Sequence, residues 1–456
     1  MKYISTRNSS KEYNFEQIFI KGLADDGGLF VPETIKKFSN EELSKLKNLD
    51  YSDLSTEIIN IFSSDFISKD ELSSLIKKSY STFREKEVVK ISNVGEIKLL
   101  ELFHGPTLAF KDVAMQFIGN LYEYYLKKND KKINIVVATS GDTGAAAIDA
   151  IKGKSNLNIF VLHPNNKISS VQRKIMTTVD EKNVFNIAID GNFDDCQNIV
   201  KQMFSDLEFS KSINMSGVNS INWARIIAQA VYYFYAHFKL EKDNISFSVP
   251  TGNFGDVFAG YLAKKMGLPI DKLIVATNEN DILHRAITKG DYISKEVRET
   301  LSPSMDIQLA SNFERLIYYV NNSNSEKTAE IMKKVKKNSY QIEKRDLDII
   351  QKDFLSESCN EKETLGIIKK NYEENGVVLD PHTAIGVGAA QKLSLNDCVV
   401  LSTAHPCKFP DATNNAINKH EKLPKELQHV LNKNENFQVL KNSTDEVKKF
   451  IKSKIL

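Results

Sequence analysis

From about residue 96 onward, the chain alternates short apolar runs with stretches whose apolar residues recur at helical spacing. Several runs are nearly continuous in Ile, Val, Leu and Phe, which is typical of strands buried on both faces of a sheet. Strands that alternate with helices predict right-handed βαβ units and a mostly parallel sheet, hence an α/β fold. The predicted strands are 97–103, Ile133–Ala138, 157–162, 184–189, 245–249, 273–276 and 398–401.

One long apolar helix interrupts this succession of strands. Residues 220–240 show helical spacing, and their most apolar part, 226–238, follows Arg225. That part is too short to cross a bilayer, so it predicts a buried core helix. The strands on either side of it indicate two α/β lobes. We place the smaller lobe at 96–217 and the larger lobe at 218–456.

Two regions lack the strand pattern. Residues 1–95 are polar, and their stretch 51–84 has apolar residues at helical spacing, which predicts a mostly helical N-terminal extension. Residues 321–375 are dense in Lys and Glu with apolar positions at helical intervals. This second pattern predicts a helical insertion, made of amphipathic helices that cover the larger lobe.

Composition narrows the class of protein. The chain of 456 residues carries 61 Lys and Arg against 59 Asp and Glu, which argues against a nucleic-acid partner because phosphate binding needs a basic excess. The 4 cysteines have no CxxC spacing, so we expect neither a disulfide framework nor a metal site. The first residues lack the apolar core of a signal peptide, and no uncharged apolar run reaches about 18 residues. We expect a cytoplasmic protein with no membrane partner.

Polar residues concentrate where predicted strands end, and α/β sheets bind their ligands at these carboxyl ends. The turn of Ser140, Gly141, Asp142 and Thr143 follows one strand and opens an Ala-rich helix. Free N–H groups at such a helix start suit a carboxylate or a phosphate. A capped turn without any ligand, with Ser140 or Asp142 as the cap, explains the same pattern.

A second turn of this kind follows the predicted strand 245–249. It contains Gly252 and Gly255, which let the backbone approach a ligand, and its N–H groups suit a phosphate. It is not a Walker A loop, because Gly-Lys-Ser/Thr is missing, and it is not a GxGxxG fingerprint. A single glycine loop is weak support for a phosphate site, and the second turn in the other lobe strengthens it.

Lys111 enters a predicted helix directly after a strand and a turn, among apolar and small residues. A helix N-terminus and desolvation both disfavour the ammonium form, and the neutral amine is what attacks a carbonyl. Taken alone, a surface lysine with its stem on apolar neighbours explains this pattern as well.

The strand 398–401 is followed by hydroxyl side chains, His405, Cys407 and Lys408. A thiol–imidazole pair between Cys407 and His405 is disfavoured, because a two-residue spacing on a bent loop does not suit its geometry.

Together these stretches resemble threonine synthases, pyridoxal-phosphate enzymes of fold type II. The resemblance extends over nearly the whole chain, and the N-terminal extension is similar to that of the longer microbial and fungal type. The motifs that carry it are 5–7 (STR), 22–32 (GLADDGGLFVP), 104–107 (HGPT), 110–112 (FKD), 140–144 (SGDTG), 252–256 (GNFGD), 301–307 (LSPSMDI) and 402–406 (STAHP).

The resemblance implies two parallel-sheet αβα lobes of the tryptophan-synthase-β-like fold. It implies an enzyme that eliminates the γ-phosphate of O-phospho-L-homoserine and adds water at Cβ, giving L-threonine in the last step of its biosynthesis. Pyridoxal 5'-phosphate would be the cofactor, no metal is implied, and the longer type resembles monomers. Lys111 would hold the cofactor as a Schiff base and move substrate protons.

The implied site residues follow from the matching motifs. The glycine loop would bind the cofactor phosphate with Asp256 closing it, Thr403 would face the pyridine nitrogen, and Phe110 would pack near the cofactor. The implied cofactor contacts are thus Phe110, Lys111, Gly252, Asn253, Phe254, Gly255, Asp256 and Thr403. The turn Ser140, Gly141, Asp142 and Thr143 would receive the substrate carboxylate. Candidates for the substrate phosphate, from charge and position, are Lys408, Arg173, His104 and Arg225.

Three other functions remain to be weighed. A threonine or serine dehydratase, or a sulfur-transferring synthase, would keep the lysine and the phosphate loop, and a dehydratase would release 2-oxobutyrate or pyruvate. A non-catalytic binding protein of the same fold is disfavoured because Lys111 stands in its full motif. A phosphate-loop nucleotide hydrolase is disfavoured because neither glycine loop has the lysine that its chemistry requires.

Overall fold

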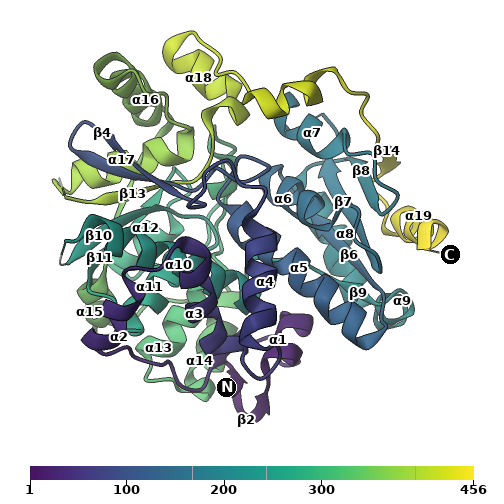
Figure 1. Cartoon of the computed structure of the whole chain (residues 1–456), viewed down its shortest axis with the longest axis horizontal. Helices are drawn as coiled ribbons and strands as arrows, with labels where there is room; N and C mark the ends of the chain where they lie inside the picture. Colours follow the sequence, from purple (N-terminus) through teal and green to yellow (C-terminus); the bar gives the residue numbers. More distant parts are fainter. Residues whose placement is uncertain (167, 243, 396, 456) are drawn as a thin grey trace.

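A computed structural model describes residues 1–166, 168–242, 244–395 and 397–455. Its two large sheets lie side by side, with β10, β11 and β13 on the left of Figure 1 and β6, β7 and β8 on the right. The larger sheet has the order β12-β11-β10-β13-β5-β4, and its strands are β4 (Lys90–Val94), β5 (Ile97–Glu101), β10 (Ile245–Pro250), β11 (Ile270–Thr277), β12 (Phe354–Ser358) and β13 (Val399–Ser402). The smaller sheet has the order β14-β8-β7-β6-β9, and its strands are β6 (Ile133–Ala138), β7 (Leu157–Pro164), β8 (Val184–Asp190), β9 (Met215–Ser216) and β14 (Gln438–Lys441).

Every predicted strand is present, and the α/β class is confirmed. Pairing in both sheets is parallel except between β4 and β5. The helices around the sheets are α5 (Lys111–Asn129), α6 (Asp142–Ile151), α7 (Ser170–Thr177), α8 (Phe193–Ser205), α9 (Leu207–Ser212), α11 (Gly255–Lys265), α12 (Ile282–Lys289), α17 (Pro381–Lys392), α18 (Pro410–Ile417), α19 (Thr444–Ile455) and the 3₁₀ turns η1 (Pro303–Met305), η2 (Pro406–Lys408) and η3 (Lys425–Asn432). Among the described residues, none of these helices combines the length and apolar character needed to span a bilayer.

The lobe boundary expected at residue 96 does not separate the two sheets. β5, which we expected in the smaller lobe, pairs with β13 of the larger sheet, and β4 adds an antiparallel edge to it. At the other end of the chain, β14 leaves the larger lobe and pairs with β8 of the smaller sheet. Parallel partners are joined by long crossovers, so the hydrophobic pattern of a strand does not reveal its neighbour.

The N-terminal region is helical, as expected, and it also contains a small antiparallel sheet of order β2-β1-β3. Its elements are β1 (Tyr3–Ser5), β2 (Asn8–Tyr13), α1 (Phe15–Lys21), β3 (Phe30–Pro32), α2 (Asn40–Leu46), α3 (Tyr51–Ser63) and α4 (Lys69–Tyr80). β2 is exposed from Asn8 to Glu12, so it lacks the alternating pattern that predicts a strand. Ser68 caps α4 through a capping box with Glu71 and so divides the helical stretch 51–84 into two helices.

The predicted core helix is α10 (Trp223–Leu240), which is buried along almost its whole length and packs against α3, α5 and α11. The predicted helical insertion is corrected in one respect: β12 lies inside it and forms an edge of the larger sheet. Because β12 has few apolar residues and stands in a stretch dense in Lys and Glu, the sequence pattern does not reveal it as a strand. The helices of this region are α14 (Ser325–Lys336), α15 (Lys344–Asp353) and α16 (Glu361–Asn375), and α13 (Phe313–Val320) directly precedes it.

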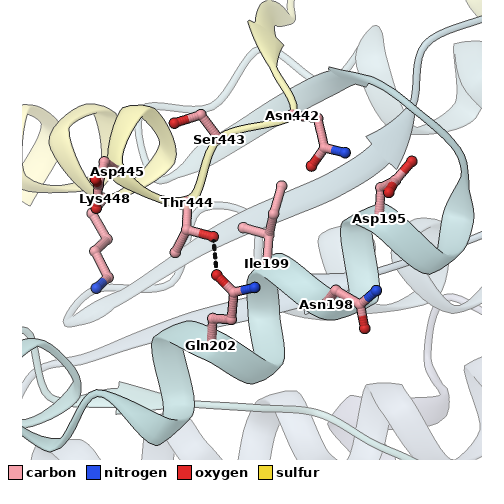
Figure 2. A pocket seen from close by; sticks show the side chains of 9 residues that line it. All are labelled: Asp195, Asn198, Ile199, Gln202, Asn442, Ser443, Thr444, Asp445 and Lys448. Atoms are coloured by element: carbon pink, nitrogen blue, oxygen red, sulfur yellow. Dashed lines mark hydrogen bonds between the residues drawn. The ribbon is translucent and has the colours of Figure 1, made fainter.

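The C-terminal helix α19 lies against α8 of the smaller lobe, and a polar surface pocket of about 480 Å³ opens between them (Figure 2). Thr444 Oγ1 donates a hydrogen bond to Gln202 Oε1 at 2.6 Å across this contact. Asp195, which also lines the pocket, belongs to the capping box of α8. The hydrogen bond from Thr444 thus joins the C-terminal helix to the smaller lobe.

Candidate active site

The four motif stretches meet around the side chain of Lys111. Its Nζ lies 3.9 Å from Asp142 Oδ2 and donates a hydrogen bond to Ser304 Oγ at 3.3 Å. The stretch after β13 is tied to the start of α5, because the Phe110 N–H donates to the carbonyl of Thr403 at 2.8 Å. The glycine loop joins them through Ser304, since a Cβ on Gly252 would lie 2.4 Å from the Ser304 carbonyl oxygen.

Lys111 has the properties of a reactive amine. Only 12% of its side chain is exposed, and burial lowers its pKa to about 8. Asp142 opposes this shift, while the positive charges of Arg225 and Lys408 add to it. The direction agrees with the expectation from the sequence, and the neutral amine is therefore much more populated near neutral pH than that of an ordinary lysine.

A buried ion pair supports the turn beside Lys111. The fully buried Lys408 places its Nζ 2.7 Å from Asp142 Oδ1 and donates to the carbonyl of Thr107, also at 2.7 Å. Gln172 Nε2 donates to the same Asp142 oxygen at 2.9 Å. Burial alone would raise the pKa of Asp142, but the ammonium groups of Lys408 and Lys111 hold it well below its usual range. Two of the three donors of Lys408 are thus used inside the protein.

The turn 140–143 retains free donors for an anion. Thr139 Oγ1 accepts the N–H groups of Gly141 at 3.0 Å and Gly144 at 2.8 Å. Gly141 has φ 137°, where a side chain would be strained, and its Cβ would also meet Gln172 at 2.8 Å. In the described part of the chain, no acceptor pairs with the N–H groups of Asp142 and Thr143 at the start of α6.

The glycine loop presents a cradle of backbone donors at the start of α11. Asn312 fixes the loop, because its backbone N–H and its Nδ2 both donate to the carbonyl of Asn253, at 3.1 and 3.0 Å. Phe254 adopts φ 63°, which turns the chain into the helix. Among residues 1–166, 168–242, 244–395 and 397–455, nothing accepts the N–H groups of Gly252, Asn253 or Gly255. Such a nest of N–H groups fits a phosphate.

The Asp256 side chain, which we expected to close the phosphate loop, contacts two tyrosines of α10. Its carboxylate accepts hydrogen bonds from the hydroxyls of Tyr232 and Tyr233 on α10, the latter at 3.1 Å. Burial raises the pKa of Asp256 to about 7, although both tyrosines counteract it. These hydrogen bonds tie the Asp256 side chain to α10.

Thr403 and Phe110 lie side by side at the start of α5, and their contact with the cofactor stays a prediction. Thr403 is buried and its N–H donates to Thr383 Oγ1 at 3.3 Å, while its own hydroxyl has no partner in the described chain. The Lys111 Nζ lies 5.8 Å from the centroid of the Phe110 ring. Burial raises the pKa of the Cys407 thiol to about 12, which disfavours the thiolate that a nucleophilic cysteine needs.

The structure brings to the site three residues for which the sequence analysis predicts no role. Ser304 donates through its N–H to His382 Nε2 at 3.3 Å, and His382 Nδ1 lies 2.9 Å from Asp380 Oδ1. The imidazole therefore accepts at Nε2 and donates from Nδ1 to the carboxylate. Ser304 stood in the 301–307 motif without a function, whereas Asp380 and His382 look like an ordinary helix start in the sequence.

The other candidates for binding the substrate phosphate differ in whether an acidic residue of the protein already pairs with them. Arg173 forms two hydrogen bonds to Glu435, at 2.8 and 3.1 Å, and His104 lies 2.9 Å from Glu101. Arg225 is buried, and its Nε has no hydrogen-bond partner among the described residues. The structure thus leaves Arg225 as the unpaired cation of this set.

Comparison with known proteins covers nearly the whole chain. Residues 2–80 match the family model "Threonine synthase N terminus", residues 92–403 match "Pyridoxal-phosphate dependent enzyme", and residues 383–451 match "Threonine synthase, C-terminal". Threonine synthase of Pseudomonas aeruginosa is 44% identical over 99% of this chain and 98% of its own length. That of Saccharomyces cerevisiae is 45% identical over 94% of this chain and 93% of its own length.

A solved structure agrees with these matches. The crystal structure of pyridoxal-phosphate-bound threonine synthase from Brucella melitensis superimposes with a TM-score of 0.96 at 43% identity, covering 100% of this chain and 99% of that one. The cofactor also fits the residues found here, namely a buried amine of lowered pKa, a cradle of free N–H groups and an unpaired hydroxyl at Thr403. The chain belongs to the threonine synthase family of pyridoxal-phosphate-dependent enzymes.

Proposed function

We propose that this protein converts O-phospho-L-homoserine and water into L-threonine and inorganic phosphate, with pyridoxal 5'-phosphate bound covalently through Lys111. One observation carries the proposal: the buried Lys111 amine, with its pKa lowered to about 8, lies where the anion-binding turn, the glycine loop and Thr403 meet. A lysine that serves as both nucleophile and proton carrier needs a pKa near the working pH.

Each group of residues in the site has a separate role in the proposed reaction. When bound, pyridoxal phosphate supplies a ring that accepts electron density from the carbon next to the substrate amine. Lys111 Nζ takes and returns substrate protons, and Ser304, at 3.3 Å, orients that nitrogen. The N–H groups of Gly252, Asn253 and Gly255, which have no acceptor in the described chain, would hold the cofactor phosphate. The hydroxyl of Thr403, which is free of other partners in the described chain, would face the ring nitrogen of the cofactor and, being neutral, would not keep that nitrogen protonated.

The substrate is held by its charges. Its carboxylate binds the free N–H groups of Asp142 and Thr143 at the start of α6, beside the hydroxyl of Ser140 and the backbone of Gly141. Lys408 contributes by neutralising Asp142, which keeps this turn in place. The smaller lobe thus supplies the carboxylate turn and the larger lobe the cofactor-phosphate loop. We place the enzyme in the cytoplasm as a monomer without a nucleic-acid or membrane partner, in line with its near-neutral charge of +2.

The proposal is tested with purified, cofactor-loaded protein and O-phospho-L-homoserine. We expect phosphate and threonine in equal amounts, each quantified separately in the same reaction. Phosphate released with 2-oxobutyrate would instead make the protein a lyase that does not control the addition of water. If the fully loaded protein forms no product, the proposal is refuted, and only the fold and the family assignment remain.

Gly252→Ala is expected to weaken the binding of pyridoxal phosphate by about tenfold or more. The new methyl group would lie 2.4 Å from the backbone oxygen of Ser304, so the phosphate cradle must shift. Titration of the cofactor-free protein with pyridoxal phosphate and with pyridoxal, followed by absorbance, separates the effects, because pyridoxal lacks the phosphate. Gly366→Ala is the matched control, since its Cβ would meet no atom within 4 Å. Unchanged affinity for pyridoxal phosphate in Gly252→Ala would contradict the role of the loop.

A further inference from the structure

His382 is a buried histidine whose two ring nitrogens both have partners inside the protein. It lies in the first turn of α17, is 3% exposed, and its Nδ1 lies 2.9 Å from Asp380 Oδ1. Asp380 is also buried, and its other carboxylate oxygen accepts the hydroxyl of Thr383. A carboxylate beside Nδ1 holds the hydrogen of the neutral imidazole on that atom, so Nε2 is an acceptor.

The acceptor Nε2 binds the backbone of the short turn η1. It receives the N–H of Ser304, the central residue of this turn, at 3.3 Å. The side chain of Ser304 contacts the reactive amine, because its Oγ accepts from Lys111 Nζ at 3.3 Å and donates to Asp142 Oδ2 at 3.4 Å. The hydroxyl therefore joins Lys111 to Asp142, and the amide of the same residue joins both to His382.

The turn η1 is held on either side by one polar side chain and at its centre by His382. Asn278 Nδ2 donates to Ser302 Oγ at 2.9 Å and to Asp306 Oδ1 at 2.8 Å, which flank the turn. In the described part of the chain, the N–H of Ser304 has no acceptor other than the imidazole. Without His382, the flanking contacts would remain and the centre of the turn would lose its anchor.

The start of α17 does not itself require an imidazole. Asp380 caps the helix with its carboxylate, which accepts the backbone N–H groups of His382 at 3.0 Å and Thr383 at 3.4 Å. The imidazole packs edge-on against Phe409, with ring centroids 4.8 Å apart, and an apolar ring could make the same contact. Capping and packing therefore leave the hydrogen bond to Ser304 unexplained.

We propose that His382 is a positioning residue for the reactive amine of Lys111. Oriented by Asp380, its imidazole fixes the amide of Ser304, whose hydroxyl in turn fixes that amine. This inference rests on the proposed function, in which the amine holds the cofactor and moves substrate protons. A displacement of about 1 Å at a reacting group can cost about a hundredfold in rate, so the contacts behind the amine affect turnover.

The test compares His382→Asn with His382→Gln. The amide oxygen of glutamine can take the place of Nε2 and accept the Ser304 N–H, whereas asparagine reaches only the place of Nδ1. We expect His382→Asn to lower kcat by about tenfold or more with little change in KM for O-phospho-L-homoserine, and His382→Gln to recover most of the loss. His163→Asn is the matched control, because His163 is a buried histidine of β7 whose Nε2 has no partner among the described residues. It should leave kcat unchanged.

Capture of pyridoxal by the cofactor-free protein reports on the amine without turnover. Pyridoxal lacks a phosphate, so its capture does not depend on the glycine loop. The rate, followed by absorbance, should fall about tenfold or more in His382→Asn and recover in His382→Gln. A His382→Asn protein that unfolds at a lower temperature but captures pyridoxal at the wild-type rate would make His382 a structural residue and overturn the proposal.

A double substitution decides whether His382 acts through Ser304. In the Ser304→Ala background the hydroxyl is already absent, so His382→Asn should slow capture by less than about twofold further. An equal loss in both backgrounds would show that His382 acts independently of Ser304, contrary to the proposal.

One more variant keeps the test decisive if His382→Asn does not fold. Asp380→Asn retains a helix cap but no longer requires Nδ1 to carry the hydrogen, so it should also slow the capture of pyridoxal. Capture does not depend on turnover. A protein that makes no threonine would therefore refute the proposed function, while the capture rates would still decide the role of His382.

Discussion

Lys111→Ala is expected to reduce the formation of threonine and phosphate by about a thousandfold or more. The substitution removes both the nitrogen that holds the cofactor and the group that carries substrate protons. The site offers no replacement, because Lys408 is fully buried and bound to Asp142 and Thr107. Product formation is measured together with the visible absorbance of the covalently bound cofactor, which should be absent from the variant.

The fold should survive this change. Asp142 keeps its closer partner, Lys408 at 2.7 Å, when the Lys111 ammonium at 3.9 Å is lost. Lys127→Ala, in the last turn of the same helix, removes an exposed lysine paired with Glu123 and should leave turnover and absorbance unchanged. Turnover of Lys111→Ala above about one tenth of the wild-type value would contradict the assignment, since acid–base groups usually contribute about a hundredfold or more.

Much of this site was predictable because its parts are local in sequence. Lys111, the turn 140–143 and the loop 252–255 each follow a strong apolar strand, and the end of a parallel strand is where a ligand binds. The strands themselves were found because they are buried on both faces. The edge strands β2 and β12 escaped, because one is almost wholly exposed and the other lies within a charged helical region.

The side chains that hold these groups in place come from residues far apart in the chain, and the spacing of residues in the sequence does not reveal such contacts. Lys408 looked like a free cation for the substrate, yet the fold buries it against Asp142. Asp256 looked like part of the phosphate loop, yet its carboxylate turns to the tyrosines of α10. His382 looked like part of an ordinary helix start, yet its imidazole accepts the N–H of Ser304 in the folded structure.

Lys408→Met is expected to lower the free energy of unfolding by about 3–5 kcal/mol, the usual effect of removing one partner of a buried ion pair. Methionine has a similar length, so the change removes the charge while leaving most of the volume filled. The Asp142 Oδ1 atom, which Lys408 contacts in the wild type, would then keep only Gln172 Nε2, at 2.9 Å, as a close donor. Urea unfolding measures the loss. The double variant Asp142→Asn with Lys408→Met should recover most of it, because no buried charge is left unpaired.

The same substitution should raise the pKa of Lys111 above its value of about 8. Lys408 is one of the positive charges that disfavour the Lys111 ammonium, and its removal also leaves Asp142 free to stabilise that ammonium. The rate at which cofactor-free protein captures pyridoxal phosphate should therefore rise with pH through a higher midpoint than in the wild type. Adding Asp142→Asn removes the carboxylate that favours the ammonium, so the midpoint should move down again. A midpoint that does not respond to either change would mean that the buried pair holds the turn in place without tuning the reactive amine.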